Sequence, residues 1–300
     1  MASRRQFLAW GGASLWLAGK SGIEFGTTSV TAGSMRFHGP YGLELYSFRN
    51  QMKTDARRAL REIRAIGYTE VEVVYDYWGP FTEGELRKRL DQAGLKCTSA
   101  FYPPHHFEKS VSGVIAGART LGARSIICGS VPGAFGKKPL TLDDYKRAAE
   151  IFNRWGQQLR KAGMAMGYHN HNYEFKRFDG QPAFDTLINM TDPRFLNFEM
   201  DVFWVKAGGQ DPVAYLKRYP SRFKILHLKD MRKGTRIPTF SIHDVSPEAS
   251  VALGQGILNM PAILHQAARI GIRRYYVEDE SAEALENVKV SYEYLKTVRF

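Results

Sequence analysis

Cysteine is scarce in this chain of 300 residues. The two cysteines, Cys97 and Cys128, are too few for a disulfide framework, and they lack the CxxC or Cys/His spacing of a zinc site. Each lies within an apolar run, so we expect both to be buried and to act as small hydrophobic side chains. The sequence therefore excludes a scaffold held together by disulfides.

Long apolar runs are also missing. The stretch Leu8 to Ala18 is moderately apolar, but Gly11 and Gly12 interrupt it and it is too short to span a bilayer. It follows Ser3-Arg4-Arg5, and paired arginines before Phe-Leu are typical of a twin-arginine export signal. The alternative is a basic disordered tail.

We expect residues 1–33 to be an export signal and linker, and residues 34–300 to form a single folded domain. On that hypothesis the twin-arginine translocation machinery is a partner. The protein would be periplasmic or secreted, with no stable membrane insertion after removal of the signal. The oligomeric state is open, and a homo-oligomer is compatible with the sequence.

Acidic residues are outnumbered, with 30 Asp and Glu against 42 Lys and Arg, which gives a formal net charge of +12. The basic residues are mixed with acidic ones on expected helix surfaces, as in Arg57 to Glu62, and no basic arm or basic-aromatic motif accompanies them. We therefore expect a solvated surface with modest attraction for anions, and no nucleic-acid partner.

One pattern recurs along the chain: an amphipathic helix ends in glycine, and a short β-branched run follows within a few residues. The glycine is expected to adopt the left-handed conformation that stops a helix. The pattern occurs at Gly67, Gly94, Gly122, Gly163 and Gly271. With the gaps filled, it predicts strands at about residues 42–48, 69–75, 96–102, 124–130, 164–171, 196–204, 223–230 and 273–280.

Strands that alternate with helices predict a parallel sheet with right-handed crossovers. Eight such units favour a closed (β/α)8 TIM barrel in the α/β class, in one domain. No G-x-G-x-x-G motif follows the first strand, which argues against a dinucleotide-binding fold. The long segment from Met231 to Gln255 follows the seventh strand, and we expect it to be a lid near the site.

Ionisable side chains gather where the strands of such a barrel end, which is where its active sites lie. They are Glu70, Glu72, His169, His171, Glu174, Glu199, Asp201, His227, Lys229, Asp230, Glu278, Asp279 and Glu280. Residues two apart share one side of a strand, so several pairs could converge on one mouth. Because unpaired buried charges are costly, a divalent cation with oxygen and nitrogen ligands is expected there. The lack of thiols suits Mn, Co, Zn or Mg.

Each of these residues also has a structural alternative. His169 and His171 could be hydrogen-bonded core histidines, and Lys229-Asp230 could be a turn pair. Asp201 or Glu278 alone could be capping or salt-bridge residues. The histidine pair together with Glu174 at one strand end favours a site, as does the convergence of the whole set.

At these residues the chain resembles the xylose-isomerase-like, or sugar phosphate isomerase/epimerase, superfamily, also called the AP endonuclease family 2 superfamily. The matching stretches cover nearly all of the chain after the expected signal. They are Gly42 to Arg49, Gly67 to Glu72, Tyr168 to Phe175, Asp201 to Pro212, His227 to Asp230, Leu253 to Gly256 and Val277 to Glu280.

The resemblance implies one divalent metal ion held by carboxylates and a histidine, with Asp201, His227 and Glu278 on ligand positions. Many relatives have Glu where His169 stands, so either His169 is the fourth ligand or Glu174 reaches in. We expect Glu174, with His169 or His171 as the acid/base. The related three-zinc DNA-repair endonucleases require a histidine where Trp204 stands, which argues against that activity.

We expect proton abstraction next to a carbonyl of a sugar or keto-sugar, by a metal-dependent isomerase or epimerase. Glu72 or Glu278 would return the proton, and Lys229 would stabilise the oxyanion. Tyr46, Phe101 and Trp204 offer faces for a sugar ring. The alternatives are a lyase or dehydratase on 3-keto-glycosides or inososes, and a sugar-binding barrel without turnover. Phosphodiester hydrolysis, which needs several metal ions, is a further alternative.

Overall fold

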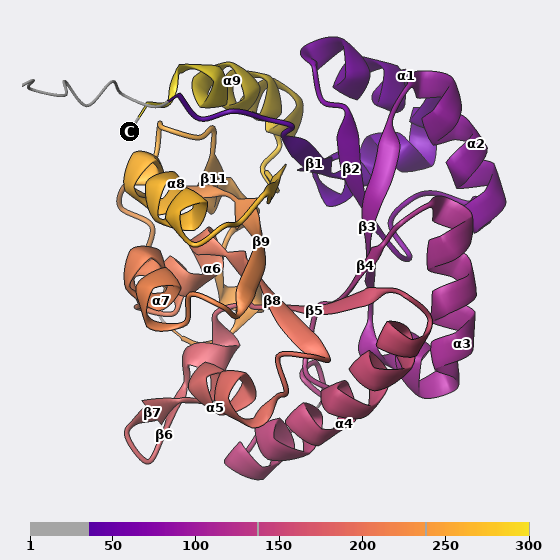
Figure 1. Cartoon of the computed structure of the whole chain (residues 1–300). Helices are drawn as coiled ribbons and strands as arrows, with labels where there is room; N and C mark the ends of the chain where they lie inside the picture. Colours follow the sequence, from indigo (N-terminus) through magenta and orange to yellow (C-terminus); the bar gives the residue numbers. More distant parts are fainter. Residues whose placement is uncertain (1–35, 137, 238, 300) are drawn as a thin grey trace, which may run out of the picture. The chain divides into compact units, whose positions relative to one another are not determined.

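The computed structural model describes residues 36–136, 138–237 and 239–299, and the expected export signal lies outside these residues. Eight parallel strands close into a barrel in the order β1-β12-β9-β8-β5-β4-β3-β2, with helices around it (Figure 1). The strands are β1 (Gly42–Glu44), β2 (Glu70–Val74), β3 (Lys96–Tyr102), β4 (Ser125–Cys128), β5 (Ala165–His169), β8 (Leu196–Asp201), β9 (Phe223–Leu228) and β12 (Arg274–Val277). The predicted (β/α)8 barrel is confirmed.

The helices bury one apolar stripe each against the outer faces of the strands. They are α1 (Arg49–Ile66), α2 (Glu83–Ala93), α3 (Pro104–Leu121), α4 (Leu142–Lys161), α5 (Ala183–Met190), α6 (Val202–Ala207), α7 (Pro212–Arg218), α8 (Met260–Arg269) and α9 (Ala284–Thr297). Helix α4 begins after Thr141, whose side chain accepts a hydrogen bond from the Asp144 backbone in a capping box. Gly94 and Gly122 end α2 and α3 with positive φ.

All of the predicted strands except the third end one to four residues earlier in the structure, and for two of them the cause is clear. The first stops at Glu44 because the chain turns into the 3-10 helix η1 (Leu45–Phe48), which buries Leu45 and Phe48. The sixth stops at Asp201, whose side chain accepts a hydrogen bond from the Trp204 backbone at 2.9 Å and begins α6. Both corrections fall at the carboxyl ends of strands.

The core has two parts. A large one lies between the helices and the outer faces of the strands, and it contains both free cysteines in buried positions, as predicted. A small one inside the barrel consists of Ile127, Ile225 and Tyr276, with Phe101 packed against it. These side chains form an apolar floor beneath the charged residues at the strand ends.

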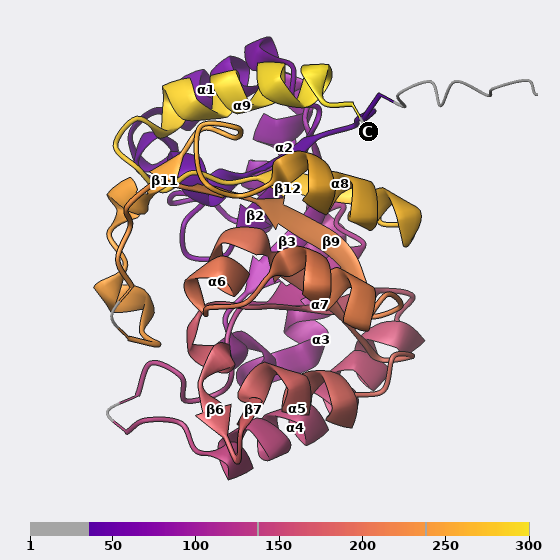
Figure 2. The same cartoon turned by 90° about the vertical axis from the view of Figure 1, so that its left-hand side faces the viewer.

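The predicted lid segment contains short elements of its own. They are β10 (Asp230–Met231), η3 (Ile242–Asp244), η4 (Pro247–Ala249) and β11 (Ser250–Val251), and β10 pairs with β11. The Asp230 carboxylate accepts hydrogen bonds from the backbone of Met231, Gly254, Gly256 and Leu258 and so ties the two ends of the segment together. Figure 2 shows the segment, in orange, on the same side of the barrel as the loop before α4.

The remaining short elements follow β5. They are η2 (Tyr173–Phe175), β6 (Arg177–Phe178) and β7 (Gln181–Pro182). Of the helices in the described ranges, none has both the length and the apolar character needed to cross a bilayer.

Candidate metal centre and active-site cavity

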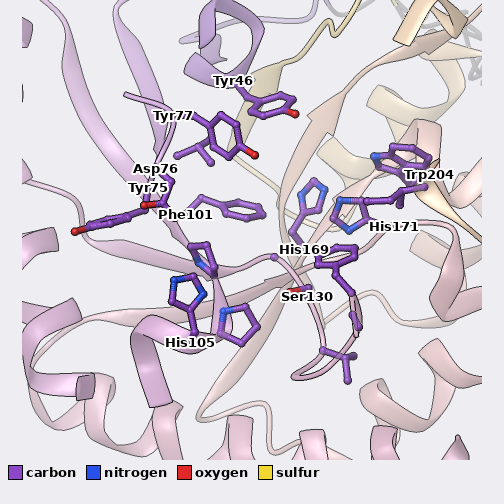
Figure 3. Close-up of a pocket in the computed structure, with 18 of the residues that line it drawn as sticks. Tyr46, Tyr75, Asp76, Tyr77, Phe101, His105, Ser130, His169, His171 and Trp204 are labelled. Atoms are coloured by element: carbon purple, nitrogen blue, oxygen red, sulfur yellow. The ribbon is translucent and has the colours of Figure 1, made fainter. Parts of the chain in front are cut away.

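A cavity of about 840 Å³ opens where the strands end. Tyr46, Phe101 and Trp204, the aromatic residues predicted to contact a sugar ring, line this cavity (Figure 3). Residues of the predicted lid segment, among them Ile242 and Val245, also line the cavity. The predicted position of this segment near the site is therefore confirmed. A cavity of this size and composition is typical of small-molecule sites.

His227 lies at the centre of the charged residues. Its Nε2 is 2.8 Å from Glu72 Oε1 and 3.1 Å from Glu199 Oε1. Its Nδ1 is 3.0 Å from Glu278 Oε2 and 3.6 Å from Glu44 Oε2. Burial disfavours the charged imidazole, but the carboxylates of Glu199 and Glu44 outweigh that cost and raise the pKa of His227 well above its usual range.

Asp201 approaches His227 from the neighbouring strand β8, and His169 approaches it from β5, the next strand around the barrel. The His169 ring centroid is 4.6 Å from that of His227, and His169 Nδ1 is 3.0 Å from Glu199 Oε1. One ligand-type atom from each of His169, Asp201 and His227 lies within 4.8 Å of the others. Ligand-type atoms lie equally close together in two further groups. One consists of Glu44, His227 and Glu278, and the other of Glu72, Glu199 and His227.

Several carboxylate oxygens in this cluster have no hydrogen-bond partner among the described residues. They are Glu44 Oε2, Glu72 Oε2, Glu199 Oε2 and Asp201 Oδ2, and all are buried. Burial raises the pKa of Asp201 to about 7, and burial with the neighbouring Glu72 carboxylate raises that of Glu199 to about 8. Unpartnered buried carboxylates are costly, and a divalent cation would satisfy them. The donor set therefore fits a metal ion.

Lys229 neutralises one side of the cluster. Its Nζ is 3.1 Å from Glu278 Oε1, it also bonds Glu280, and it lies 5.0 Å from the ring centroids of Phe203 and Trp204. Burial opposes the ionisation of Glu278, but Lys229 outweighs it, and the pKa of Glu278 lies well below its usual range. Glu278 therefore stays ionised.

Of the predicted site residues, His169, His171 and Glu278 line the cavity, while Asp201, His227 and Lys229 lie in the buried cluster behind it. Glu174 and Glu72 do not line the cavity either. Glu174 Oε1 accepts a hydrogen bond from the Tyr168 hydroxyl at 2.6 Å and Oε2 accepts one from the His171 backbone at 2.9 Å. It belongs to none of the three groups around His227, and burial raises its pKa to about 7. Glu72 lies beneath His227 and is not among the residues that line the cavity.

His171 does line the cavity, with its ring stacked on Tyr173 and tilted against Trp204. Its Nδ1 is buried and makes no hydrogen bond within the described part of the chain. Burial, followed by the charge of Lys229, lowers the pKa of His171 to about 3. The side chain is therefore a neutral imidazole.

The sequence reasoning missed Glu44 as a site residue. It is the last residue of β1, it is 5% exposed and it lines the cavity beside Glu278. Burial and the Glu278 carboxylate raise the pKa of Glu44 well above its usual range. Active sites of such barrels lie at the carboxyl ends of the strands, and Glu44 stands at that end of β1, so the same principle predicts it.

Comparison with known proteins gives consistent similarities. The sequence model of the family described as xylose isomerase-like TIM barrel matches residues 60–298. The inosose dehydratase of Lacticaseibacillus casei is 30% identical in an alignment 193 residues long, which covers 59% of this chain and 63% of that protein. The match thus spans less than two thirds of that relative.

Solved structures extend the similarity to most of the chain. A sugar phosphate isomerase/epimerase from Parabacteroides distasonis ATCC 8503 aligns with a TM-score of 0.71 and 30% identity, over 90% of this chain and 96% of that one. The IOLI protein with a bound zinc atom aligns with a TM-score of 0.63 and 14% identity, over 84% of this chain and 95% of that one. At 14% identity the likeness shows the fold alone.

Proposed function

The chain belongs to the xylose isomerase-like TIM barrel family, and from this premise we propose that it is a divalent-metal-dependent sugar isomerase or epimerase. The observation that carries the proposal is the buried cluster of carboxylates and imidazoles around His227, with unpartnered oxygens, at the base of an open cavity. The similarity to the P. distasonis sugar phosphate isomerase/epimerase supports a small-molecule sugar or keto-sugar as substrate.

The proposed metal ligands are His169, Asp201, His227 and Glu278. His169 replaces the expected Glu174, because both oxygens of Glu174 already accept hydrogen bonds. Mixed imidazole and carboxylate donors suit Mn, Co, Zn or Mg. When bound, the ion would supply Lewis-acid polarisation of the substrate carbonyl.

We assign the proton transfer to Glu44. Its Oε2 makes no hydrogen bond within the described residues, and the side chain lies on the cavity wall, so a substrate proton can reach it. Its raised pKa favours a carboxyl group that can hold a proton between removal and return. Glu72 or Glu278 was expected to return the proton. Glu278 is proposed here as a metal ligand, and the contact of Glu72 with His227 Nε2 favours a positioning role for Glu72.

His171 faces Glu44 from across the barrel, because β1 and β5 lie opposite each other in the closed strand order. As a neutral imidazole it is suited to a hydrogen bond with a substrate oxygen rather than to proton abstraction. Lys229, expected to stabilise an oxyanion, keeps Glu278 ionised instead. Tyr46, Phe101 and Trp204 would contact the apolar face of the sugar.

A dehydratase is the second candidate, and the similarity to inosose dehydratase favours it. The first step is the same removal of a proton next to a carbonyl. Loss of the hydroxyl group on the neighbouring carbon then gives water and an unsaturated ketone instead of a rearranged sugar. Inososes and 3-keto-glycosides are substrates that allow this outcome.

The test is a screen in deuterated water. The protein, loaded in turn with Mn, Co, Zn or Mg, is incubated with free sugars, inososes and 3-keto-glycosides, and products are followed by NMR. We expect deuterium at the carbon next to the carbonyl, together with a new isomer or epimer. An unsaturated product would instead identify the dehydratase. Binding without deuterium incorporation under all four metals would identify a sugar-binding protein and overturn the proposal.

The cellular location follows from the N-terminal sequence and not from the site. We propose export through the twin-arginine machinery to the periplasm or the medium, on the basis of Arg4, Arg5 and the apolar stretch after them. Replacing both arginines by lysine should leave the protein in the cytoplasm of the producing cell. Unchanged export of that variant in cell fractions would contradict the proposal.

A further inference from the structure

A second group of ligand-type side chains lies at the mouth of the cavity. Asp76 follows β2, and His105 and His106 lie in the first turn of α3. One ligand atom from each of these three residues lies within 4.8 Å of the others. Figure 3 shows Asp76 and His105 on the side of the cavity opposite His171 and Trp204. None of the three belongs to the groups around His227.

The ring of His106 is held in place by its neighbours. Its centroid lies 4.0 Å from that of Tyr75 and 4.2 Å from that of His105. Its Nε2 is buried and makes no hydrogen bond in the described ranges. The Asp76 Oδ2 atom is 3.8 Å from it, which is too far for a hydrogen bond. A buried ring nitrogen and a half-exposed carboxylate thus face each other without a hydrogen bond between them.

The spacing suits a shared ion. Two ligands that each lie about 2.1 Å from one tetrahedral ion are about 3.4 Å apart, so small side-chain rotations would bring this pair into place. Asp76 holds its carboxylate there from a left-handed backbone conformation, with φ of 70°, which few residues other than glycine adopt. Burial, followed by the neighbouring His105, lowers the pKa of His106, which favours the neutral imidazole that metals bind.

We propose that Asp76, His105 and His106 bind a second divalent cation, at the mouth of the cavity. Two imidazoles and one carboxylate form a zinc-type donor set with a coordination position left for water or a substrate oxygen. Asp76 and His105 line the same cavity as the inner cluster, so an ion there would meet the part of the substrate farthest from His227. The site does not depend on which reaction the inner cluster catalyses.

The test counts bound ions on the untagged full chain. The protein is stripped with a chelator and dialysed against Zn²⁺, and zinc and protein are measured. We expect two ions per chain, the outer one held more weakly because its ligands are more exposed. All eight histidines and both cysteines lie within the described residues, so the remaining residues offer neither imidazole nor thiolate ligands.

Variants separate the two sites. Asp76→Asn tolerates the left-handed backbone and should lose the outer ion without unfolding, as checked by circular dichroism. His105→Ala/His106→Ala should lose the same ion, and Glu278→Gln should lose only the inner one. His243→Ala is the matched control, because His243 lines the cavity but lies outside the group, and it should keep both ions.

The outcomes are distinguishable. One ion per chain in the unaltered protein at saturating Zn²⁺, or two ions in His105→Ala/His106→Ala, would overturn the outer site. Retention of both ions by Glu278→Gln would instead count against the inner ligand set and leave the outer site standing. Cobalt substitution gives a second readout, since loss of the outer ion should remove one set of visible absorption bands.

Discussion

The two arcs of the barrel rim differ in chemistry. The arc of β1, β12, β9, β8 and β5 carries the buried carboxylates and imidazoles, with Glu44, Glu278, His227, Asp201 and His169 at successive strand ends. The opposite arc, β3 and β4, presents Phe101, Gly129 and Ser130 to the same cavity. β2 lies between them and contributes Glu72 beneath His227.

The difference has a physical cause. Buried charges are tolerable only close to charges of the opposite sign, so they gather on one arc around His227, Lys229 and the proposed cation. The opposite arc has no charged residue at the carboxyl ends of β3 and β4 and presents the Phe101 ring there, while Asp76, His105 and His106 lie farther out, at the mouth of the cavity. A sugar has polar hydroxyl edges and an apolar face of C–H groups, so a cavity with one polar wall and one aromatic wall fits it. The comparison predicts that variants on the two arcs fail in different ways.

The largest effect is expected on the charged arc, for Glu278→Gln. The change removes a charged ligand while it keeps the shape of the side chain, so the inner ion should be lost with the barrel intact. Activity should fall by about a thousandfold or more, or about 4 kcal/mol of transition-state stabilisation. The measurement is bound metal per chain together with turnover.

Glu280→Gln is its matched control. Glu280 also bonds Lys229, but it belongs to none of the ligand groups, so this variant should keep the inner ion. Full activity and full metal content in Glu278→Gln would mean that the charged arc does not hold the ion. The comparison of the two arcs would then lose its basis.

A smaller effect is expected for Lys229→Met on the same arc. The variant leaves Glu278 and Glu280 buried without their cation, and breaking a buried pair costs about 3–5 kcal/mol. We expect this loss of stability in the metal-free protein and a smaller one with metal bound, because an ion that binds the folded state stabilises it. Denaturant unfolding with and without Zn²⁺ measures both.

Lys224→Met controls for the loss of a lysine from the same strand, because Lys224 is exposed on β9. It should change stability by less than about 0.5 kcal/mol. If added metal restored none of the stability of Lys229→Met, the proposed ion would not share the neutralising role of the lysine.

The fold could be predicted because its signals are local. Each glycine that ends a helix and each β-branched run acts within a few residues, so all eight strands were found. The end of the sixth strand at Asp201 could not be predicted, because the Asp201 side chain caps the next helix and so ends the strand. The pattern of alternating faces gives no sign of that hydrogen bond.

The site could be predicted in part for a related reason. The residues within strands, Asp201 and His227, lie where alternation places them, close together. Glu174 lies beyond the end of β5, in the 3-10 helix η2, where alternation no longer applies, and it turns toward Tyr168. Glu72 is the register partner of Glu44 in the pairing of β1 with β2, but its side chain contacts His227 Nε2 and does not line the cavity.

The smallest effect is expected on the apolar arc, for Gly129→Ala. A Cβ atom at Gly129 would lie 1.6 Å from Cζ of Phe101, so the ring must move. Overpacking of this kind costs about 1–3 kcal/mol of stability. We expect KM to rise several-fold, since Phe101 would lose its place against the substrate, while the metal content stays unchanged.

Two variants make that prediction sharp. In Gly84→Ala the new methyl group lies in α2, 4.0 Å from Cγ2 of Thr120, so neither KM nor stability should suffer. Phe101→Leu combined with Gly129→Ala gives the methyl group room, and it should recover stability but not KM, because the aromatic face is gone. Loss of metal in Gly129→Ala would show that the two arcs are not independent. The ring centroids of Phe101 and His169 are 5.4 Å apart, so a displaced Phe101 ring would then have moved a proposed ligand.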